Sequence, residues 1–210
     1  MNSRGRTARE PLSSWPLTET PRRAAVLSLT TKRIKSKICL VGDKSVGKTS
    51  LVRRYVMNMF DEQYITTIGT RVSKKEVQVS LATQDLHLQV DMMIWDIMGE
   101  KGFRELLKDA YFYGANGILA VADLTRRRTL DDLDDWIDGV EPLIGKVPVL
   151  IVVNKADLTS SAQFTERDVA QFAKAYGSDF LLTSAKTGEH VESAFTRLAS
   201  VVVEGQLHPA

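Results

Sequence analysis

Continuous apolar runs recur along the chain, separated by segments whose apolar residues follow a helical period. A run without polar positions is typical of a strand buried on both faces of a parallel sheet. The runs predict strands over Ser36–Val41, Gly117–Ala122, Val147–Val153 and Phe180–Leu182. Apolar residues about 3.6 positions apart predict helices instead. These helices are expected from Lys48 onward and over 103–113, 130–143, 166–176 and 191–203.

A second pattern, alternation of apolar and polar residues, covers residues 77–81 and again 86–90. Because residues 82–85 can form a turn, the two stretches predict a hairpin whose second strand continues to Trp95. Strands that alternate with helices, with one hairpin among them, predict a three-layer α/β fold. Its sheet should be mostly parallel, with one antiparallel edge strand.

Composition is that of a soluble globular chain, with 43% hydrophobic and 26% charged residues in a length of 210. This excludes a disordered chain, a collagen and a coiled-coil rod. Cys39 is the single cysteine, so an internal disulfide and a four-cysteine zinc site are both excluded. The longest apolar run, Val147–Val153, is far shorter than the ~18–20 residues of a membrane-spanning helix.

The net charge of +2 is unevenly distributed. Residues 1–37 hold nine Lys or Arg against two Glu, a net charge of +7, so residues 38–210 carry −5. We expect residues 1–33 to be a basic, disordered arm, residues 34–204 to be one folded domain and residues 205–210 to be a short tail. The arm is either a solvated tail, a product of a misassigned start codon, or a contact with an anionic surface. We therefore expect a cytoplasmic protein with at most weak electrostatic membrane contact.

The most specific motif lies between the first predicted strand and the first helix, and it matches G-x-x-x-x-G-K-[ST]. Backbone N–H groups of such a loop turn inward around phosphate oxygens, and the helix N-terminus adds partial positive charge. Lys48 is placed to reach the outer phosphates, and Thr49 to offer a hydroxyl to Mg²⁺. The predicted phosphate site is Gly42, Asp43, Lys44, Ser45, Val46, Gly47, Lys48, Thr49 and Ser50.

Asp96 ends the second strand of the predicted hairpin, where it should face the loop that carries Thr49. A carboxylate at this position is suited to hold Mg²⁺, usually through water. Gly99 follows three residues later and is able to present a bare N–H to a terminal phosphate.

Two tetrapeptides that follow consecutive predicted strands select the base. They are Asn154-Lys155-Ala156-Asp157 and Thr183-Ser184-Ala185-Lys186. Guanine presents two donors on one edge, and the Asp157 carboxylate would accept both, whereas adenine would leave it unpaired. Asn154 is suited to tie loops together and to meet N7, the stem of Lys155 to cover the base, and the Ala185 N–H to donate to O6.

With these motifs in place, residues 36 to about 204 resemble a Ras-superfamily small GTPase, and within it the Rab-like branch. The resemblance extends to Tyr64–Gly69, Trp95-Asp96, Tyr111–Ala115, Leu124-Thr125 and Val153–Leu158. It implies the P-loop NTPase fold of a small G domain, with a six-stranded sheet, one antiparallel strand and five helices. It also implies that the cofactors are GTP or GDP with Mg²⁺.

The resemblance assigns further roles within the site. Thr67 would be a second hydroxyl ligand of Mg²⁺ when a γ-phosphate is bound, Phe60 would flank the guanine and Tyr64 would cover the phosphates. Lys48, Thr67, Gly99 and Glu100 would be the catalytic set for hydrolysis of GTP to GDP and phosphate. Protein effectors or regulators would bind the switch regions, residues 61–72 and 95–113, with Trp95 among the contacts. We expect a monomer without a nucleic-acid partner.

Three departures from the family pattern bear on function. Glu100 stands where the family has the water-orienting glutamine; an ionised Glu accepts hydrogen bonds but donates none. Lys44 replaces a small residue, next to where a partner's arginine would enter. The sequence ends without a cysteine, so we expect no prenylation. An archaeal or bacterial relative of the Rab branch would fit this pattern.

These departures leave two functions open. One is a GTP-hydrolysing switch that is slow without a partner, and the other is a guanine-nucleotide-binding module with little or no hydrolysis. If the missing glutamine is the limiting loss, Glu100→Gln should raise the rate.

Overall fold

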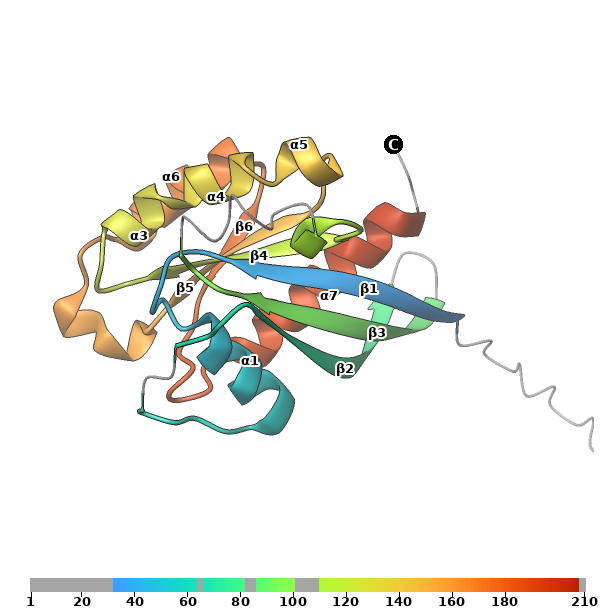
Figure 1. Cartoon of the computed structure of the whole chain (residues 1–210), viewed down its shortest axis with the longest axis horizontal. Helices are drawn as coiled ribbons and strands as arrows, with labels where there is room; N and C mark the ends of the chain where they lie inside the picture. Colours follow the sequence, from blue (N-terminus) through green and yellow to red (C-terminus); the bar gives the residue numbers. More distant parts are fainter. Residues whose placement is uncertain (1–31, 64–65, 82–85, 101–109, 208–210) are drawn as a thin grey trace, which may run out of the picture.

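Six strands form one sheet in the order β2-β3-β1-β4-β5-β6 (Figure 1). The computed structural model describes residues 32–63, 66–81, 86–100 and 110–207. The pair β2–β3 is antiparallel and all other neighbours are parallel, which confirms the predicted fold class. The strands are β1 Lys32–Val41, β2 Thr70–Leu81, β3 Leu86–Ile97, β4 Gly117–Asp123, β5 Val149–Asn154 and β6 Asp179–Leu182.

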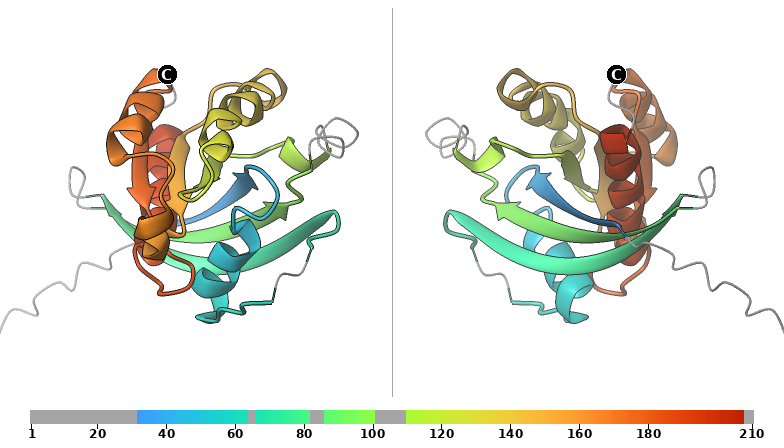
Figure 2. Two further views of the ribbon diagram at one scale, coloured as in Figure 1. Left: turned by 90° about the vertical axis from the view of Figure 1, so that its left-hand side faces the viewer. Right: turned by 90° about the vertical axis from the view of Figure 1, so that its right-hand side faces the viewer.

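Helices cover both faces of the sheet (Figure 2). Alternate residues of β1 point to opposite faces: Ile38 and Leu40 pack with α1 and α7, whereas Cys39 and Val41 pack with the remaining helices. This gives two buried clusters, as expected for a central β1. The helices are α1 Lys48–Met57, α3 Arg128–Asp131, α4 Leu133–Asp138, α5 Glu141–Ile144, α6 Glu166–Ala175 and α7 Val191–Leu207, with a 3₁₀ helix η1 at Ala156–Ser161.

The single helix predicted over residues 130–143 is wrong, because three short helices, α3 to α5, occupy this region. Pro142 has no N–H, and its ring would clash with the carbonyl of Asp138 if the helix continued. Helix α4 accordingly ends at Asp138, and Gly139 follows as its cap. The described residues therefore contain six α-helices where the resemblance implied five. The helix predicted over 103–113 lies mostly outside the described residues, although residues 110–112 are helical.

The folded region as described is slightly longer than the predicted domain of 34–204. Strand β1 begins at Lys32 and α7 ends at Leu207. Four of the nine basic residues near the N-terminus therefore belong to β1, and Arg33 among them pairs with Asp91 and Glu76. The predicted hairpin turn, residues 82–85, and the arm up to residue 31 lie outside the described residues. Among the helices that the structure describes, none is long and apolar enough to cross a membrane.

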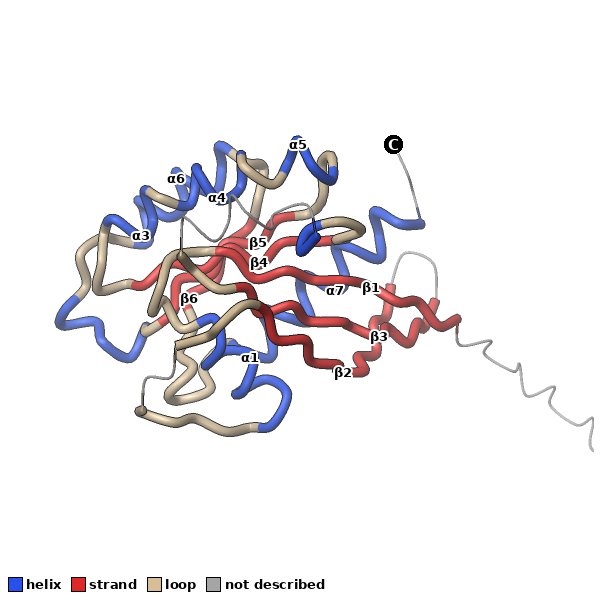
Figure 3. Tube along the Cα trace, in the orientation of Figure 1, coloured by secondary structure: helices blue, strands red, loops and turns tan. Residues whose placement is uncertain are grey.

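Strands β1, β3, β4, β5 and β6 are parallel and end at the same edge of the sheet, and the loops that follow them gather there (Figure 3). Leu40 of β1 is in register with Asp96 of β3, and Asp123 of β4 with Asn154 of β5. Polar residues distant in sequence are thereby brought together at the carboxyl ends of the strands, where open α/β sheets bind their ligands.

Candidate functional site

A cavity of about 460 Å³ lies at this edge of the sheet. The predicted site residues on its walls are Lys44, Ser45, Gly47, Lys48, Thr49, Ser50, Phe60, Thr67, Gly99, Glu100, Asn154, Lys155, Asp157, Ala185 and Lys186. Five others, Gly42, Asp43, Val46, Asp96 and Ser184, are not part of the wall, and Asp96 and Ser184 are buried. Tyr64 lies outside the described residues. The cavity thus brings together the predicted phosphate loop and the two tetrapeptides predicted to select the base.

The phosphate loop follows a path that side chains would block at two positions. Gly42 has φ 128° and Gly47 has φ 99°, both in the region that favours glycine. A Cβ on Gly42 would overlap the Val121 carbonyl, and one on Gly47 would overlap the Asn154 side-chain amide. Gly47 also caps α1, so the N-terminus of this ten-residue helix opens onto the cavity. This arrangement suits an anionic ligand.

Lys48 is the first residue of α1 and is 6% exposed. Its ammonium donates to the carbonyl oxygens of Gly42 at 2.5 Å and Asp43 at 2.9 Å. Burial lowers the pKa of Lys48 to about 8, although the charges of Asp96 and Asp43 act in the opposite direction. Gly99 lies directly against this group, since a Cβ there would be 2.5 Å from Lys48 Nζ. A bound phosphate would keep the ammonium charged.

Three oxygen-bearing side chains meet beside Lys48. The Thr49 hydroxyl donates to Asp96 Oδ2 at 2.5 Å and lies 2.7 Å from the Thr67 hydroxyl oxygen. Asp96 is 1% exposed, and its Oδ1 has no hydrogen-bond partner among the residues that the structure describes. Burial raises the pKa of Asp96, against the lowering effect of the Thr49 hydrogen bond and the Lys48 charge.

These residues fit a magnesium ion. A hard cation would satisfy the unpartnered carboxylate oxygen and favour its ionised form. Among the described residues no group of three or more His, Cys, Asp or Glu is placed to hold a metal. One carboxylate and two hydroxyls suit Mg²⁺, which usually keeps waters and takes phosphate oxygens as its other ligands.

At the other end of the cavity, Asn154 joins the phosphate loop to the loop after β6. Its side chain donates to Val46 O at 2.9 Å and accepts from the Ala185 N–H at 3.0 Å. The Ala185 N–H, which the sequence assigned to guanine O6, is therefore engaged by Asn154 in this structure. The Ser184 hydroxyl donates to Asp157 at 2.5 Å and so fixes the carboxylate predicted to read the base.

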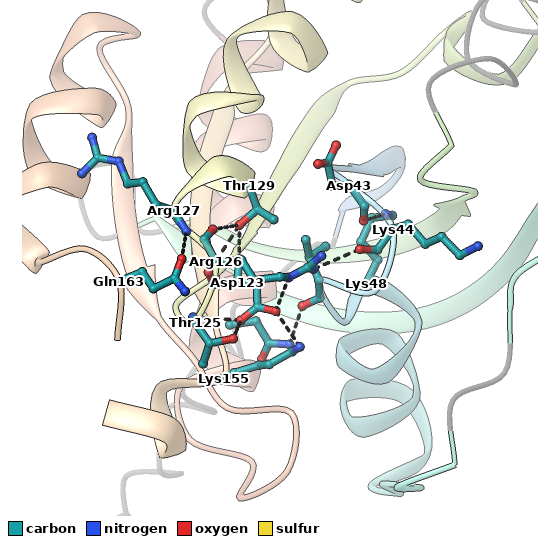
Figure 4. Close-up of polar contacts among 12 residues, drawn as sticks. Asp43, Lys44, Lys48, Asp123, Thr125, Arg126, Arg127, Thr129, Lys155 and Gln163 are labelled. Atoms are coloured by element: carbon teal, nitrogen blue, oxygen red, sulfur yellow. Dashed lines mark hydrogen bonds and ion pairs between the residues drawn. The ribbon is translucent and has the colours of Figure 1, made fainter. Parts of the chain in front are cut away.

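Asp123, which the sequence did not single out, is fully buried and lies next to Lys155 (Figure 4). Its Oδ2 accepts from Lys155 Nζ at 2.6 Å and Arg126 Nε at 2.8 Å, and its Oδ1 accepts from the Thr125 hydroxyl at 2.7 Å. Burial alone would raise the pKa of Asp123, but these hydrogen bonds outweigh it and lower the pKa. Arg126 also donates to the Lys44 carbonyl at 3.0 Å, so one network links Lys155 to the phosphate loop.

Two further contacts stabilise the loops around the cavity. Arg54 of α1 donates to Ala185 O at 2.8 Å and to Lys186 O at 2.6 Å. Trp136 of α4 is buried and its ring N–H donates to Asp43 Oδ1 at 3.0 Å. Sequence offered no signal for either contact, because each joins residues at least 93 positions apart.

At the end of the cavity near Gly99, Lys44 Nζ lies 3.1 Å from Glu100 Oε1. The two side chains are 52% and 46% exposed, and both residues line the cavity. The two departures from the family pattern within the site thus contact each other directly.

Beyond the cavity, the predicted switch regions carry exposed apolar groups. Ile68 is 89% and Val72 44% exposed. Trp95 is only partly buried, and Lys37 Nζ lies 3.8 Å from its ring centroid.

A comparison with protein-family models adds an independent finding. The model of the Ras family matches residues 37–204, which is about four-fifths of the chain. The match begins within β1 and ends within α7, so it contains every wall of the cavity described above.

Proposed function

The chain belongs to the Ras family and carries its guanine-nucleotide-binding GTPase domain, and on this premise we propose that it is a Rab-like molecular switch of archaeal or bacterial type. It binds GTP or GDP with Mg²⁺ and hydrolyses GTP slowly without a partner. The observation that carries the proposal is the double contact of Asn154, which joins Val46 of the phosphate loop to Ala185 beside the base-reading Asp157. Phosphate and base recognition therefore belong to one cavity.

Within this cavity each residue has a defined task. Lys48 and the N–H groups of the phosphate loop bind the β- and γ-phosphates. Asp157, held by Ser184, accepts the two donors of the guanine edge, while Lys155 is anchored to Asp123 with its stem toward the base. Phe60 forms part of the same wall. Thr49, Thr67 and Asp96 would hold Mg²⁺, which when bound neutralises charge on the phosphates.

Hydrolysis requires a water aligned with the terminal phosphate. Its oxygen bonds to the γ-phosphorus while the bond from that phosphorus to the β–γ bridging oxygen breaks, and the electron pair of that bond stays on GDP. Both water protons leave on the phosphate, as H₂PO₄⁻. The Gly99 N–H binds the γ-phosphate. When the phosphate leaves, its contacts with Gly99 and Thr67 are lost, and the switch loops are released. The unassisted rate should be on the order of 10⁻⁴ s⁻¹ or lower.

Glu100 supports a second candidate, a guanine-nucleotide-binding module with little or no hydrolysis. Two measurements separate and test these functions. Nucleotide extracted from the purified protein should be GDP or GTP, and recovery of ATP would refute the proposal. Single-turnover phosphate release from the GTP-loaded protein should proceed with a half-life of hours; GTP that persists unchanged for days would establish the second candidate.

The surroundings of the site define its expected partners. Effectors or regulators would contact residues 61–72 and 95–113, where Ile68 and Val72 are exposed. The protein would act as a cytoplasmic monomer in signal transduction. Residues 1–31, which hold five Arg and two Glu, would give at most weak contact with anionic membranes.

A further inference from the structure

We propose that Lys44 is a built-in cation of the hydrolytic site and that it works with Glu100 as one unit. This inference rests on the proposed GTPase function and deepens it by assigning a residue of this chain to the work that a partner's arginine does elsewhere. The two side chains are joined at 3.1 Å across the cavity wall.

The backbone that carries Lys44 and the backbone that carries Glu100 are each held in place by neighbouring groups. Arg126, itself bound to buried Asp123, donates to the Lys44 carbonyl at 3.0 Å. Gly99, which precedes Glu100, lies so close to the phosphate loop that a Cβ would be 2.6 Å from the Asp43 carbonyl. The base of each side chain is thus set beside Lys48, at the phosphate end of the cavity.

The charges explain why the two residues occur together. An ionised Glu100 alone would be repelled by the γ-phosphate and could not stay near the attacking water. Lys44 offsets the carboxylate charge and is long enough to turn toward the phosphate when GTP is bound. Glu100 accepts a hydrogen bond from water, and Lys44 supplies the donor that a glutamine amide would otherwise provide.

A contribution to folding stability does not explain why Lys44 and Glu100 form an ion pair. Both side chains are about half-exposed, and exposed ion pairs contribute little to folding. The ion pair between Lys74 and Glu76 on β2 is similarly exposed, also contacts Asp91 and Arg33, and lies away from the cavity, so Lys74 provides a control for the loss of a lysine outside the site.

Two consequences differ from what the sequence alone suggested. Glu100→Gln should not raise the rate while Lys44 is present, because the carboxylate that positions Lys44 is lost. Lys44 lies where a partner's arginine would enter the site, and its positive charge would repel that arginine. An activating protein therefore has to act by ordering the switch regions.

The test is single-turnover release of phosphate from full-length protein loaded with radiolabelled GTP and Mg²⁺. The variants are K44A, K44R, E100Q, K44A/E100Q and the charge-exchanged K44E/E100K, with K74A as control. Each variant is also assayed for GTP affinity by displacement of a fluorescent GDP analogue. We expect K44A to slow hydrolysis about tenfold or more. This is less than the rate increase that an arginine supplied by the same chain gives in other GTPases. K44R should keep most of the rate, and K74A should match the wild type.

The exchanged pair separates a chemical role from a structural one. K44E/E100K preserves the ion pair but exchanges its ends, so the GTP-loaded variant should hydrolyse GTP as slowly as K44A. In the double variant K44A/E100Q the loss should be smaller than the product of the two single losses, because the residues act as a unit. A K44A rate equal to or above that of the wild type, with GTP bound normally, would overturn this inference and leave the proposed GTPase intact. Failure of the wild type to bind GTP would instead refute the proposed function.

Discussion

Replacing Asp123 with asparagine should speed the release of bound nucleotide although Asp123 is not part of the cavity wall. The substitution keeps the shape of the side chain but removes its charge. An amide nitrogen at the Oδ2 position would face the donors of Lys155 and Arg126, which lie 2.6 and 2.8 Å away. Thr125 would still find an acceptor at Oδ1.

The magnitude follows from the two lost charge-assisted hydrogen bonds. Each is worth about 1.5–3 kcal/mol when its groups are fully shielded. The side chains of Lys155 and Arg126 are 33% and 40% exposed, so water replaces part of each bond. We therefore expect a total loss of about 2–3 kcal/mol. If half of it appears in nucleotide binding, dissociation becomes roughly tenfold faster.

The assay follows the fluorescence of a bound GDP analogue after addition of excess GDP, together with urea unfolding of the nucleotide-loaded protein. Asp131→Asn is the matched control, because Asp131 is 57% exposed, pairs with Arg127 and has no contact with the cavity. Unchanged dissociation from D123N, with lower stability, would refute the link from Asp123 to the nucleotide and leave it a purely structural residue.

Three further predictions test other parts of the account. Asp157→Asn should weaken GTP binding by roughly 1.5–3 kcal/mol and shift preference toward xanthine nucleotides, since one acceptor becomes a donor; competition between the two nucleotides measures this, and an unchanged preference would contradict the role of Asp157. Trp136→Phe removes the hydrogen bond to Asp43 and some buried volume, so urea unfolding should show a loss of about 1–3 kcal/mol; unchanged stability would mean that the contact contributes nothing. Deletion of residues 1–31 should abolish any sedimentation with anionic vesicles without changing nucleotide affinity; strong binding by the truncated protein, or binding of the full chain that survives 0.5 M salt, would contradict weak electrostatic contact through the arm.

The fold and the loops that line the cavity could be predicted from sequence because their determinants are local. Gly42, Gly47 and Lys48 act within one loop, and the apolar runs specify buried strands directly. The broken helix was missed for a physical reason. Leu133, Trp136, Ile137 and Val140 are all buried on the same side, so their period continues across the interruption that Pro142 imposes.

The contacts missed by sequence reasoning join distant positions. Lys44 and Glu100 are 56 residues apart, and Asp123 and Lys155 are 32 apart. Each departure from the family pattern was visible on its own, but their pairing depends on how the loops after β1 and β3 meet. Asp123 carried a usable signal, because it ends a buried strand beside the strand that leads to Asn154.

The most direct test of the central claim is competition for a fluorescent GDP analogue bound to the purified protein with Mg²⁺. We predict that GDP and GTP displace it at stoichiometric concentrations while ATP fails to displace it even in large excess. Chelation of Mg²⁺ should accelerate its release, because Thr49 and Asp96 then lose the ion that links them to the phosphates. Displacement by ATP and GTP at equal concentrations would contradict the assignment of this cavity to a guanine nucleotide.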